Sequence, residues 1–441
     1  MIKYITEFKI NGVSKSGEIT MMLSLGCGCT THRLNYLGRG YTIKQERNGI
    51  LSGGDTMKDV KTEAKLTFME ATSIIVGHGV GAGILSVPYL ASRNSWREII
   101  WVIALCYCIN LVMHLMIAEL SYNNGGAQFI KCIEAELFKG KVKQIVTWIA
   151  FAFLGLSVIS NVVGFITGGG AVLNAWFGLP SWAAMLIYYA VTALVVLFGM
   201  KLVGICEKIS VFAMVIVMAV LLVATFVNEH TGFVNKFVAG SNIVALYSMV
   251  AFSLSAVMSV PQVVKGLEGD HKRIRSSIAL GTGINVGLIL LITFMTLFAC
   301  GAGVTGDGAL VDLSRKLGGW VGIVGFIFSL LALSTSFWAN TLNLRDIINE
   351  QTGWGTKTSY LISSLPCLAI ALFGFSNFVG FTRIASVIQV LTGIGIICAY
   401  HNSRKKNPDA VICGKFGGLL FQIIVCVSSV LATVGALAKV M

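Results

Sequence analysis

The sequence predicts an all-α integral membrane protein that crosses the bilayer eleven times. Of its 441 residues, 55% are hydrophobic and only 12% are charged, and the mean hydropathy is +0.80. A soluble domain carries about 25% charged residues, so this chain has too few charges to cover a water-exposed surface of this size. Apolar runs that each reach the roughly 20 residues of a membrane helix follow one another from residue 66 onward. This composition excludes a soluble enzyme, a coiled coil and a disordered chain.

The eleven apolar runs are joined by short connections, so no second domain fits between them. They occupy residues 66–92, 98–122, 143–174, 181–200, 203–227, 242–266, 274–301, 318–347, 358–375, 378–400 and 416–440. Residues 66–441 therefore form one membrane domain. Residues 1–65 are polar and glycine-rich, with no periodic apolar face and no signal-peptide pattern, and we predict a disordered N-terminal tail.

The distribution of basic residues predicts how the chain is oriented in the cell membrane. The formal net charge is +13, but the basic residues lie between apolar runs rather than on one face of a soluble domain, so no nucleic-acid partner is expected. If the N-terminus is cytoplasmic, sixteen basic residues fall in cytoplasmic connections and six on the opposite side. This asymmetry follows the positive-inside rule. With an odd number of spans, the C-terminus then lies outside.

The first span is poorly suited to a continuous helix. Glycines occur at alternate positions from Gly77 to Gly83, and Pro88 follows shortly after. Each Gly costs about 1 kcal/mol relative to Ala in a helix interior. An interrupted helix is tolerated in a membrane only where protein or a water-filled cavity covers the freed backbone groups, which are then available to a ligand. The alternative is close helix packing by small residues, but this density of glycines exceeds what packing needs. We therefore expect a binding site here, whose N–H groups suit a carboxylate.

Three short runs resemble the amino acid/auxin permease family, which belongs to the amino acid–polyamine–organocation superfamily. Gly81–Tyr89 reads GAGILSVPY, like the first-helix signature of that family. Ser259–Lys265 is similar to the proline-containing end of its sixth span and leads into a short basic loop, and Ala118–Tyr122 matches the end of its second span. The resemblance covers residues 66 to 440.

This resemblance implies a LeuT-type fold, with five helices repeated in inverted topology and one C-terminal helix added. The two halves, residues 66–227 and 242–400, are nearly equal in length, and an odd number of spans in each gives them opposite orientations. In such folds the first helix of each half is discontinuous, and the substrate binds between the two breaks. Helices 1 and 6 should therefore both be interrupted, the second near Phe252–Ser255.

The function that the resemblance implies is secondary active transport of amino acids by alternating access, driven by H⁺ or Na⁺. No catalytic motif and no zinc-ligand spacing occur in the sequence, so no enzymatic activity, cofactor or metal is expected. The expected substrate-binding residues are Gly81, Ala82, Gly83, Asn161, Phe252, Ser255 and Ser334. A neutral substrate is expected because no carboxylate lies at midplane depth to hold a cationic one. The alternative is an ion channel or a carrier of something other than amino acids, although no repeated pore signature is visible.

The coupling ion is left open by the sequence. His78 lies in the glycine-rich break and can exchange a proton near neutral pH, or it is a neutral histidine bonded to a carbonyl. For Na⁺, a cation that prefers oxygen ligands, the resemblance implies carbonyls of Gly77 and Val80 and hydroxyls of Thr335 and Ser336. Sodium-coupled relatives often carry Asn before the glycine motif, and some proton-coupled ones carry Lys in the fifth span. This chain has Gly77-His78 where that Asn would stand. It also lacks the Lys, since residues 211–223 are apolar.

The remaining ionisable residues inside the spans are predicted to be structural. Glu119 and Glu207 lie near cytoplasmic span ends, where interfacial water would solvate them, and His114 should be a neutral, hydrogen-bonded histidine. Arg383 is expected to line the outer vestibule or to extend toward the membrane surface. The eleven cysteines mostly lie in apolar runs and lack zinc-ligand spacing, so they are interpreted as small hydrophobic residues.

Overall fold

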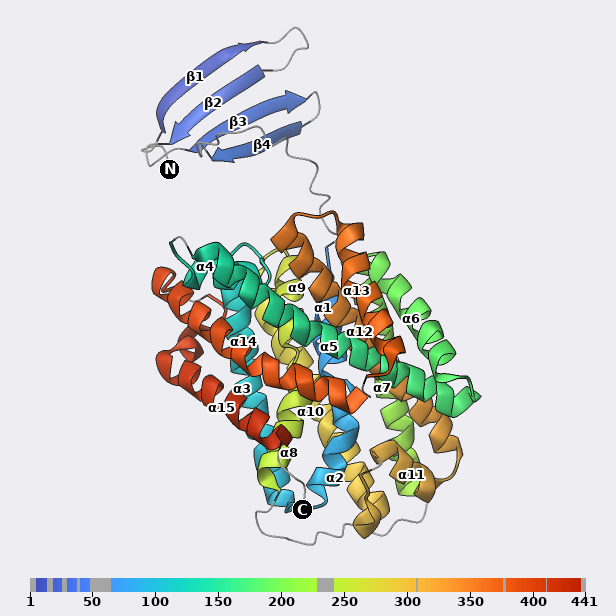
Figure 1. Cartoon of the computed structure of the whole chain (residues 1–441). Coiled ribbons are helices and arrows are strands. Elements are labelled where there is room, and N and C mark those ends of the chain that lie inside the picture. The colour runs from blue at the N-terminus through green and yellow to red at the C-terminus, as the bar shows by residue number, and fades with distance from the viewer. Residues whose placement is uncertain are drawn as a thin grey trace. The chain divides into compact units, whose positions relative to one another are not determined.

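The computed structural model describes residues 5–13, 19–25, 30–37, 40–47, 65–140, 142–227, 242–306, 308–375, 378–409 and 411–437. The chain divides into two units, Met1–Lys61 and Thr62–Met441. Within the described residues the first unit contains strands and the second contains helices (Figure 1).

The N-terminal unit contains an antiparallel sheet whose strands follow the order β1-β2-β3-β4. They are β1 (Ile5–Val13), β2 (Ile19–Leu25), β3 (Thr30–Leu37) and β4 (Gly40–Arg47). Tyr36 of β3 pairs with Tyr41 of β4, and Ile5 of β1 pairs with Leu25 of β2. The disordered tail predicted for residues 1–65 stays a prediction.

The second unit is built from α-helices and short 3-10 helices (η). In chain order they are α1 (Phe68–Gly79), η1 (Ala82–Ser86), α2 (Val87–Ala91), α3 (Trp96–Asn123), α4 (Phe129–Leu137), α5 (Lys143–Phe177), α6 (Ser181–Leu197), α7 (Met200–Val227), α8 (Ile243–Leu254), η2 (Val257–Ser259), α9 (Val260–Gly266), α10 (His271–Cys300), η3 (Gly301–Gly303), α11 (Ala309–Leu317), α12 (Trp320–Thr352), α13 (Thr356–Phe373), α14 (Phe378–Lys406), η4 (Gly414–Gly417) and α15 (Leu419–Leu437). The short helices α4 and α11 lie in connections between the predicted spans.

Several helix ends are determined by local sequence. At the start of α1, the Thr67 hydroxyl accepts the backbone N–H of Glu70, and the Glu70 carboxylate accepts that of Thr67. Ser95 and Glu98 form the same reciprocal capping box at the start of α3. At its other end, α12 stops at Gly353, whose φ of 72° is accessible to glycine at little cost.

Eight helices of the described chain are long and apolar enough to cross a membrane, or up to nine if the bent pair at the start of the domain counts as one span. The eight are α3, α5, α7, the α8–α9 segment, α10, α12, α13 and α15. Of the other predicted ranges, 181–200 contains α6, a shorter apolar helix, and 378–400 falls within α14. The protein is therefore an all-helical, multi-pass membrane protein in its second unit, and the count of eleven spans stays a prediction.

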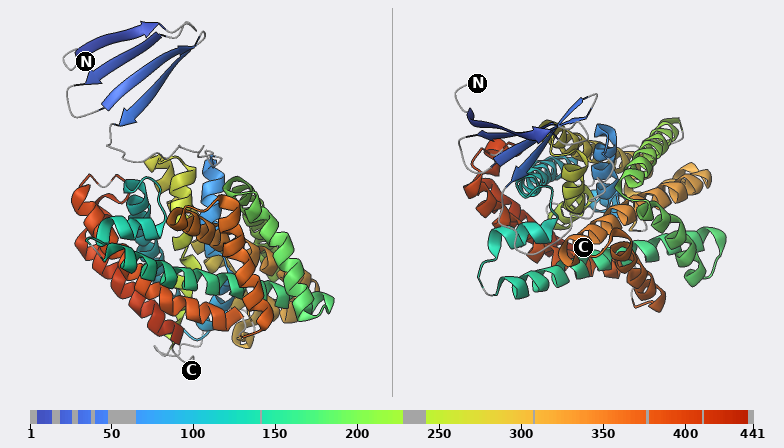
Figure 2. Two further views of the ribbon diagram at one scale, coloured as in Figure 1. Left: turned by 45° about the horizontal axis from the view of Figure 1, so that its top comes forward. Right: turned by 90° about the horizontal axis from the view of Figure 1, so that it is seen from above.

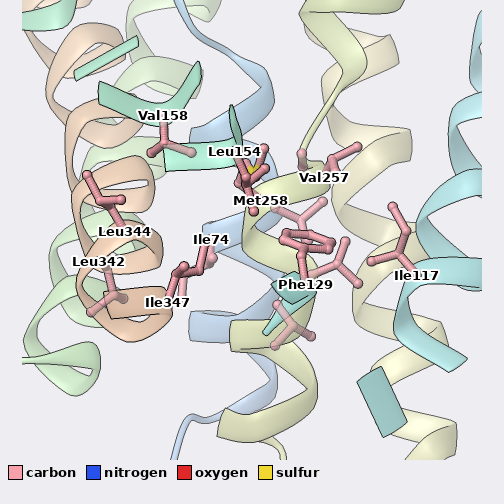
Figure 3. Close-up of a cluster of buried hydrophobic side chains, with 14 of the residues drawn as sticks. Ile74, Ile117, Phe129, Leu154, Val158, Val257, Met258, Leu342, Leu344 and Ile347 are labelled. Atoms are coloured by element: carbon pink, nitrogen blue, oxygen red, sulfur yellow. The ribbon is translucent and has the colours of Figure 1, made fainter. Parts of the chain in front are cut away.

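The helix α1 lies in the interior of the second unit, packed against α7, α10 and α12. Ile74 of α1 belongs to one of the two buried apolar clusters, together with Met258 of η2 and Leu342 of α12 (Figure 3). Farther out, α5 runs beside α14, and α14 beside α15, in both side views (Figures 1 and 2). The central position of α1 means that its geometry depends on contacts from several helices at once.

The close approach of α10 to α1 depends on Gly281. A β-carbon at Gly281 would lie 2.8 Å from Cβ of Ile75 and 3.0 Å from the carbonyl oxygen of Thr72. We therefore expect Gly281→Leu to push the two helices apart and to lower the free energy of unfolding by about 1–3 kcal/mol. Thermal unfolding of the detergent-purified protein measures this. Gly283→Leu is the matched control, because a β-carbon at Gly283 meets no atom within 4 Å; equal destabilisation by both variants would contradict the prediction.

Candidate functional site

The first membrane segment is interrupted after Gly79. The helix α1 ends there, a 3-10 turn runs from Ala82 to Ser86, and α2 begins at Val87 with Pro88 in its first turn. The axes before and after the interruption differ by 46°. The sequence pattern of alternate glycines followed by proline therefore coincides with a bend in the chain.

The helix α8 ends at Leu254, inside the apolar segment Ile243–Gly266 that is long enough to cross a membrane. Ser255 is extended, with φ −77° and ψ 112°, and the chain passes through η2 before α9 begins at Val260. The inverted repeat predicts a break near Phe252–Ser255, and a discontinuous sixth helix stays a prediction. Pro261 stands in the first turn of α9, as Pro88 does in α2, so both segments resume with a proline where no backbone donor is needed.

The two interruptions face each other. A β-carbon at Gly83 would lie 2.8 Å from ring atom Cδ1 of Phe252 and 2.8 Å from Oγ of Ser253, and one at Gly79 would lie 3.3 Å from the Ser253 carbonyl oxygen. A side chain at Gly83 would therefore require Phe252 or Ser253 to move, and one at Gly79 would also meet Nδ2 of Asn285. Phe252 nevertheless keeps 40% of its surface exposed.

Polar side chains from three other helices bind the backbone around the interruptions. Nε2 of His114, on α3, accepts the N–H of Ala256 at 3.0 Å. Nδ2 of Asn343, on α12, donates to the carbonyl of Met258 at 2.9 Å, and Nδ2 of Asn285, on α10, donates to the carbonyl of Ile75 at 3.3 Å. The sequence analysis expected a hydrogen-bonded His114 but missed both asparagines. The available signal was a buried amide within an otherwise apolar helix.

The structure brings some of the predicted substrate-binding residues together. Gly83 and Phe252 are in contact, and Ala82 lies next to them in η1. Ser255 is at the second interruption, partly exposed, and Ser334 is partly exposed on α12. Asn161 is buried on α5, and the contacts described for the chain do not join it to either interruption.

The predicted ion-coupling residues lie along one edge of the first interruption. The Thr335 hydroxyl donates to the carbonyl of Gly77 at 2.9 Å. Ser336 Oγ has no hydrogen-bond partner within the described residues, and it lies 3.0 Å from the position a β-carbon would take at Gly81. Val80 is fully buried. Nδ1 of His78 shares a 2.7 Å hydrogen bond with the Ser259 hydroxyl.

The prediction that interfacial water solvates Glu119 and Glu207 is wrong, because both side chains are fully buried. Glu119 accepts the Tyr400 hydroxyl at 2.9 Å and the Cys413 N–H at 2.8 Å, so protein donors replace water there. Glu207 has no such partners: neither carboxylate oxygen is hydrogen-bonded within the described part of the chain. The predicted role of Arg383 falls on a side chain outside the described residues.

Comparison with known proteins identifies the family. The model of the tryptophan/tyrosine permease family matches residues 64–435. The chain belongs to the tryptophan/tyrosine permease family. The resemblance to the amino acid/auxin permease family was therefore wrong. The two families share the LeuT-type fold. The short run GAGILSVPY is therefore typical of the first helix of this fold and does not distinguish the two families.

Two relatives of the chain are named as a tryptophan-specific and a tyrosine-specific transport protein. The chain is 25% identical to a tryptophan-specific transport protein of Haemophilus influenzae, and the match covers 82% of this chain and 94% of that protein. It is 23% identical, over 82% and 94%, to the tyrosine-specific transport system 1 of the same organism.

Two solved transporter structures share the fold of the permease. One is Mhp1, a nucleobase-cation-symport-1 family transporter in a closed conformation with bromovinylhydantoin bound; the TM-score is 0.61 at 14% identity, over 87% of this chain and 94% of that one. The other is MhsT in complex with L-phenylalanine, with a TM-score of 0.61 at 14% identity, over 85% and 99%. Since proteins of this one fold bind such different ligands, the fold alone does not determine the substrate.

The bond from Ala256 to His114 provides a test of how the second interruption is held. His114→Leu removes the acceptor and leaves a buried N–H unpaired, which costs about 1–3 kcal/mol of the free energy of unfolding. His114→Gln keeps an acceptor at a similar distance from the backbone and should retain most of the stability. Thermal unfolding in detergent compares the two variants. A His114→Leu protein as stable as the wild type would show that the bond does not support the interruption.

Proposed function

We propose that this permease is a secondary active transporter of neutral aromatic L-amino acids, coupled to H⁺ or Na⁺, that works by alternating access. The observation that carries the proposal is the facing pair of interrupted helices in a chain of the tryptophan/tyrosine permease family. The relatives named above are tryptophan- and tyrosine-specific transport proteins, which supports an aromatic substrate. The predicted five-plus-five inverted repeat and the cytoplasmic N-terminus are part of this proposal.

The part common to all amino acids would bind the backbone at the interruptions. In this proposal, N–H groups around Gly81, Ala82 and Gly83 hold the α-carboxylate, and carbonyls near Phe252 and Ser255 hold the α-ammonium. Backbone groups in a break of a membrane helix have lost their helical partners, so binding a zwitterion satisfies both sides. The extended conformation of Ser255 supports this arrangement, because it ends the helical bonding of α8 at that point.

The substrate side chain would be recognised mainly by apolar contact. The exposed face of Phe252 offers a ring that can pack against an indole or phenol group. Ser334 and Asn161 are the polar groups we propose for orientation, in keeping with binding sites that combine apolar walls with a few polar atoms.

Coupling would act at the first interruption, where Gly77, Val80, Thr335 and Ser336 surround the end of α1 and His78 bonds to Ser259. The existing bond from Thr335 to the Gly77 carbonyl supports a site there, because the same two oxygens can turn toward a cation. Either H⁺ or Na⁺ fits a set of oxygen ligands next to a histidine.

Alternating access would require α1 to separate from its neighbours at the predicted cytoplasmic end. There Lys201 of α7 donates to Glu70 at 2.6 Å, and the N–H of Leu66 donates to the Gly266 carbonyl at 2.9 Å. Both contacts join the first half of α1 to other segments, and both would break if that half tilted outward about the bend.

The transport proposal is tested with purified protein in liposomes. Labelled L-tryptophan and L-tyrosine should exchange against internal unlabelled substrate, and should accumulate when a pH or Na⁺ gradient is imposed separately. Tryptamine, which lacks the carboxylate, should compete about tenfold or more worse than L-tryptophan, because losing a charge-assisted bond costs at least about 1.4 kcal/mol. Exchange of no aromatic amino acid would refute the proposal, and equal competition by tryptamine would remove the carboxylate from recognition.

Phe252→Ala tests the proposed contact with the substrate side chain. We expect the apparent affinity for L-tryptophan to fall about tenfold, as expected for the loss of about 1.4 kcal/mol of aromatic packing, with a smaller change for L-alanine if that is exchanged at all. Phe328→Ala would remove a wholly buried core ring and serves to show the effect of lost packing alone. An unchanged substrate preference in a well-folded Phe252→Ala protein would locate the selectivity elsewhere.

A further inference from the structure

Glu207 lies beside the end of α1, and neither the substrate site nor the proposed set of coupling residues uses it. The side chain is fully buried on α7, and both carboxylate oxygens lack a hydrogen-bond partner among the described residues. An ionised carboxylate loses a large hydration energy on burial and is not normally left without a partner. Such a group therefore either carries a proton or faces a cation.

The carboxylate lies against the last turn of α1 before the interruption. A β-carbon at Gly77 would overlap Oε2 of Glu207 and would lie 2.8 Å from its Cδ and 3.0 Å from Cβ of Thr335. At the same point the Thr335 hydroxyl donates to the Gly77 carbonyl. Three oxygen-bearing groups from three helices thus meet here: a carboxylate from α7, a carbonyl from α1 and a hydroxyl from α12.

Of the titratable groups on α1, α7 and α12, Lys208 follows Glu207 in the chain and is exposed, and three others have partners of their own. Lys201 is paired with Glu70 at 2.6 Å, Arg345 of α12 with Asp346 at 2.6 Å, and His78 with Ser259. Cys206 precedes Glu207 in the chain. A cysteine side chain is either a neutral thiol or a negatively charged thiolate, so it provides no positive charge. None of these groups supplies a positive charge to the Glu207 carboxylate through the contacts described.

We propose that Glu207 binds the coupling cation, a proton or a sodium ion, at the junction of α1, α7 and α12. With Na⁺, the Gly77 carbonyl and the Thr335 hydroxyl complete a set of oxygen ligands; with H⁺, the carboxyl group itself is the acceptor. Gly77 is two residues before the end of α1, so tilting of this half-helix opens or closes the junction. Cation binding and helix position are thereby linked. This inference rests on the proposed transport function.

The decisive variant is Glu207→Gln, which keeps the size of the side chain and removes its charge. In liposomes it should still exchange labelled L-tryptophan for internal L-tryptophan, but gradient-driven accumulation should fall to a ratio of about one, since an uncoupled carrier only equilibrates its substrate. Separate pH and Na⁺ gradients on the wild type distinguish the two cations. Glu134→Gln, which alters a partly exposed ion pair with Lys131, is the matched control and should accumulate substrate normally.

A second measurement does not depend on transport. Substrate addition to wild-type protein in weakly buffered detergent solution should change the pH, or radioactive sodium should bind in a scintillation assay, and the corresponding signal should disappear in Glu207→Gln. If that variant does not fold, Thr335→Val, which removes the hydroxyl, should weaken sodium binding or shift the pH dependence of accumulation.

The outcomes separate the two proposals. No exchange of aromatic amino acids by the wild type refutes the transport function. Exchange by the wild type with undiminished gradient-driven accumulation by Glu207→Gln refutes the role of Glu207. Retained accumulation in Glu207→Gln with loss in His78→Gln would assign the coupling proton to His78 and would also overturn the inference, as would wild-type accumulation that responds to neither gradient.

Discussion

The arrangement of the membrane domain depends on one constraint: a helix that is interrupted inside an apolar environment must find new partners for its freed backbone groups. Here the partners are side chains on other helices. His114 binds the backbone at Ala256, Asn343 at Met258, Asn285 at Ile75 and Thr335 at Gly77. Each of these bonds joins a broken segment to a continuous helix. The same contacts therefore stabilise the interruptions and determine their positions.

Close packing and interruption, which the sequence analysis treated as alternatives for the glycine run, both operate in the structure. The helix does end at Gly79. Yet a side chain or carbonyl from another segment occupies the space that a β-carbon would need at Gly77, Gly79 and Gly83. The missing side chains let Glu207, Asn285 and Phe252 reach the backbone of the first segment. A glycine at these positions is therefore needed for access by neighbours as much as for backbone freedom.

What could be predicted from the sequence is what depends on local pattern. Span positions follow from runs of apolar residues, and the first interruption follows from glycines and a proline close together in the chain. The roles of Asn285 and Glu207 could not be predicted, because each depends on a partner more than a hundred residues away. The family was misassigned because a nine-residue run describes a broken helix that several families share.

The position of Glu207 also accounts for a puzzle in the ion-coupling motifs. The chain lacks the Asn that sodium-coupled relatives carry before the glycine motif, and it lacks a Lys in the apolar part of its fifth span. A Lys there would bring a fixed positive charge toward α1 and α12. Glu207 is on that same helix, and its carboxylate lies at Gly77 and Thr335. A carboxylate at this point can bind a positively charged partner reversibly, whereas a lysine would be a permanently bound positive charge. In our proposal the coupling cation supplies that charge, so a lysine in the fifth span is not needed.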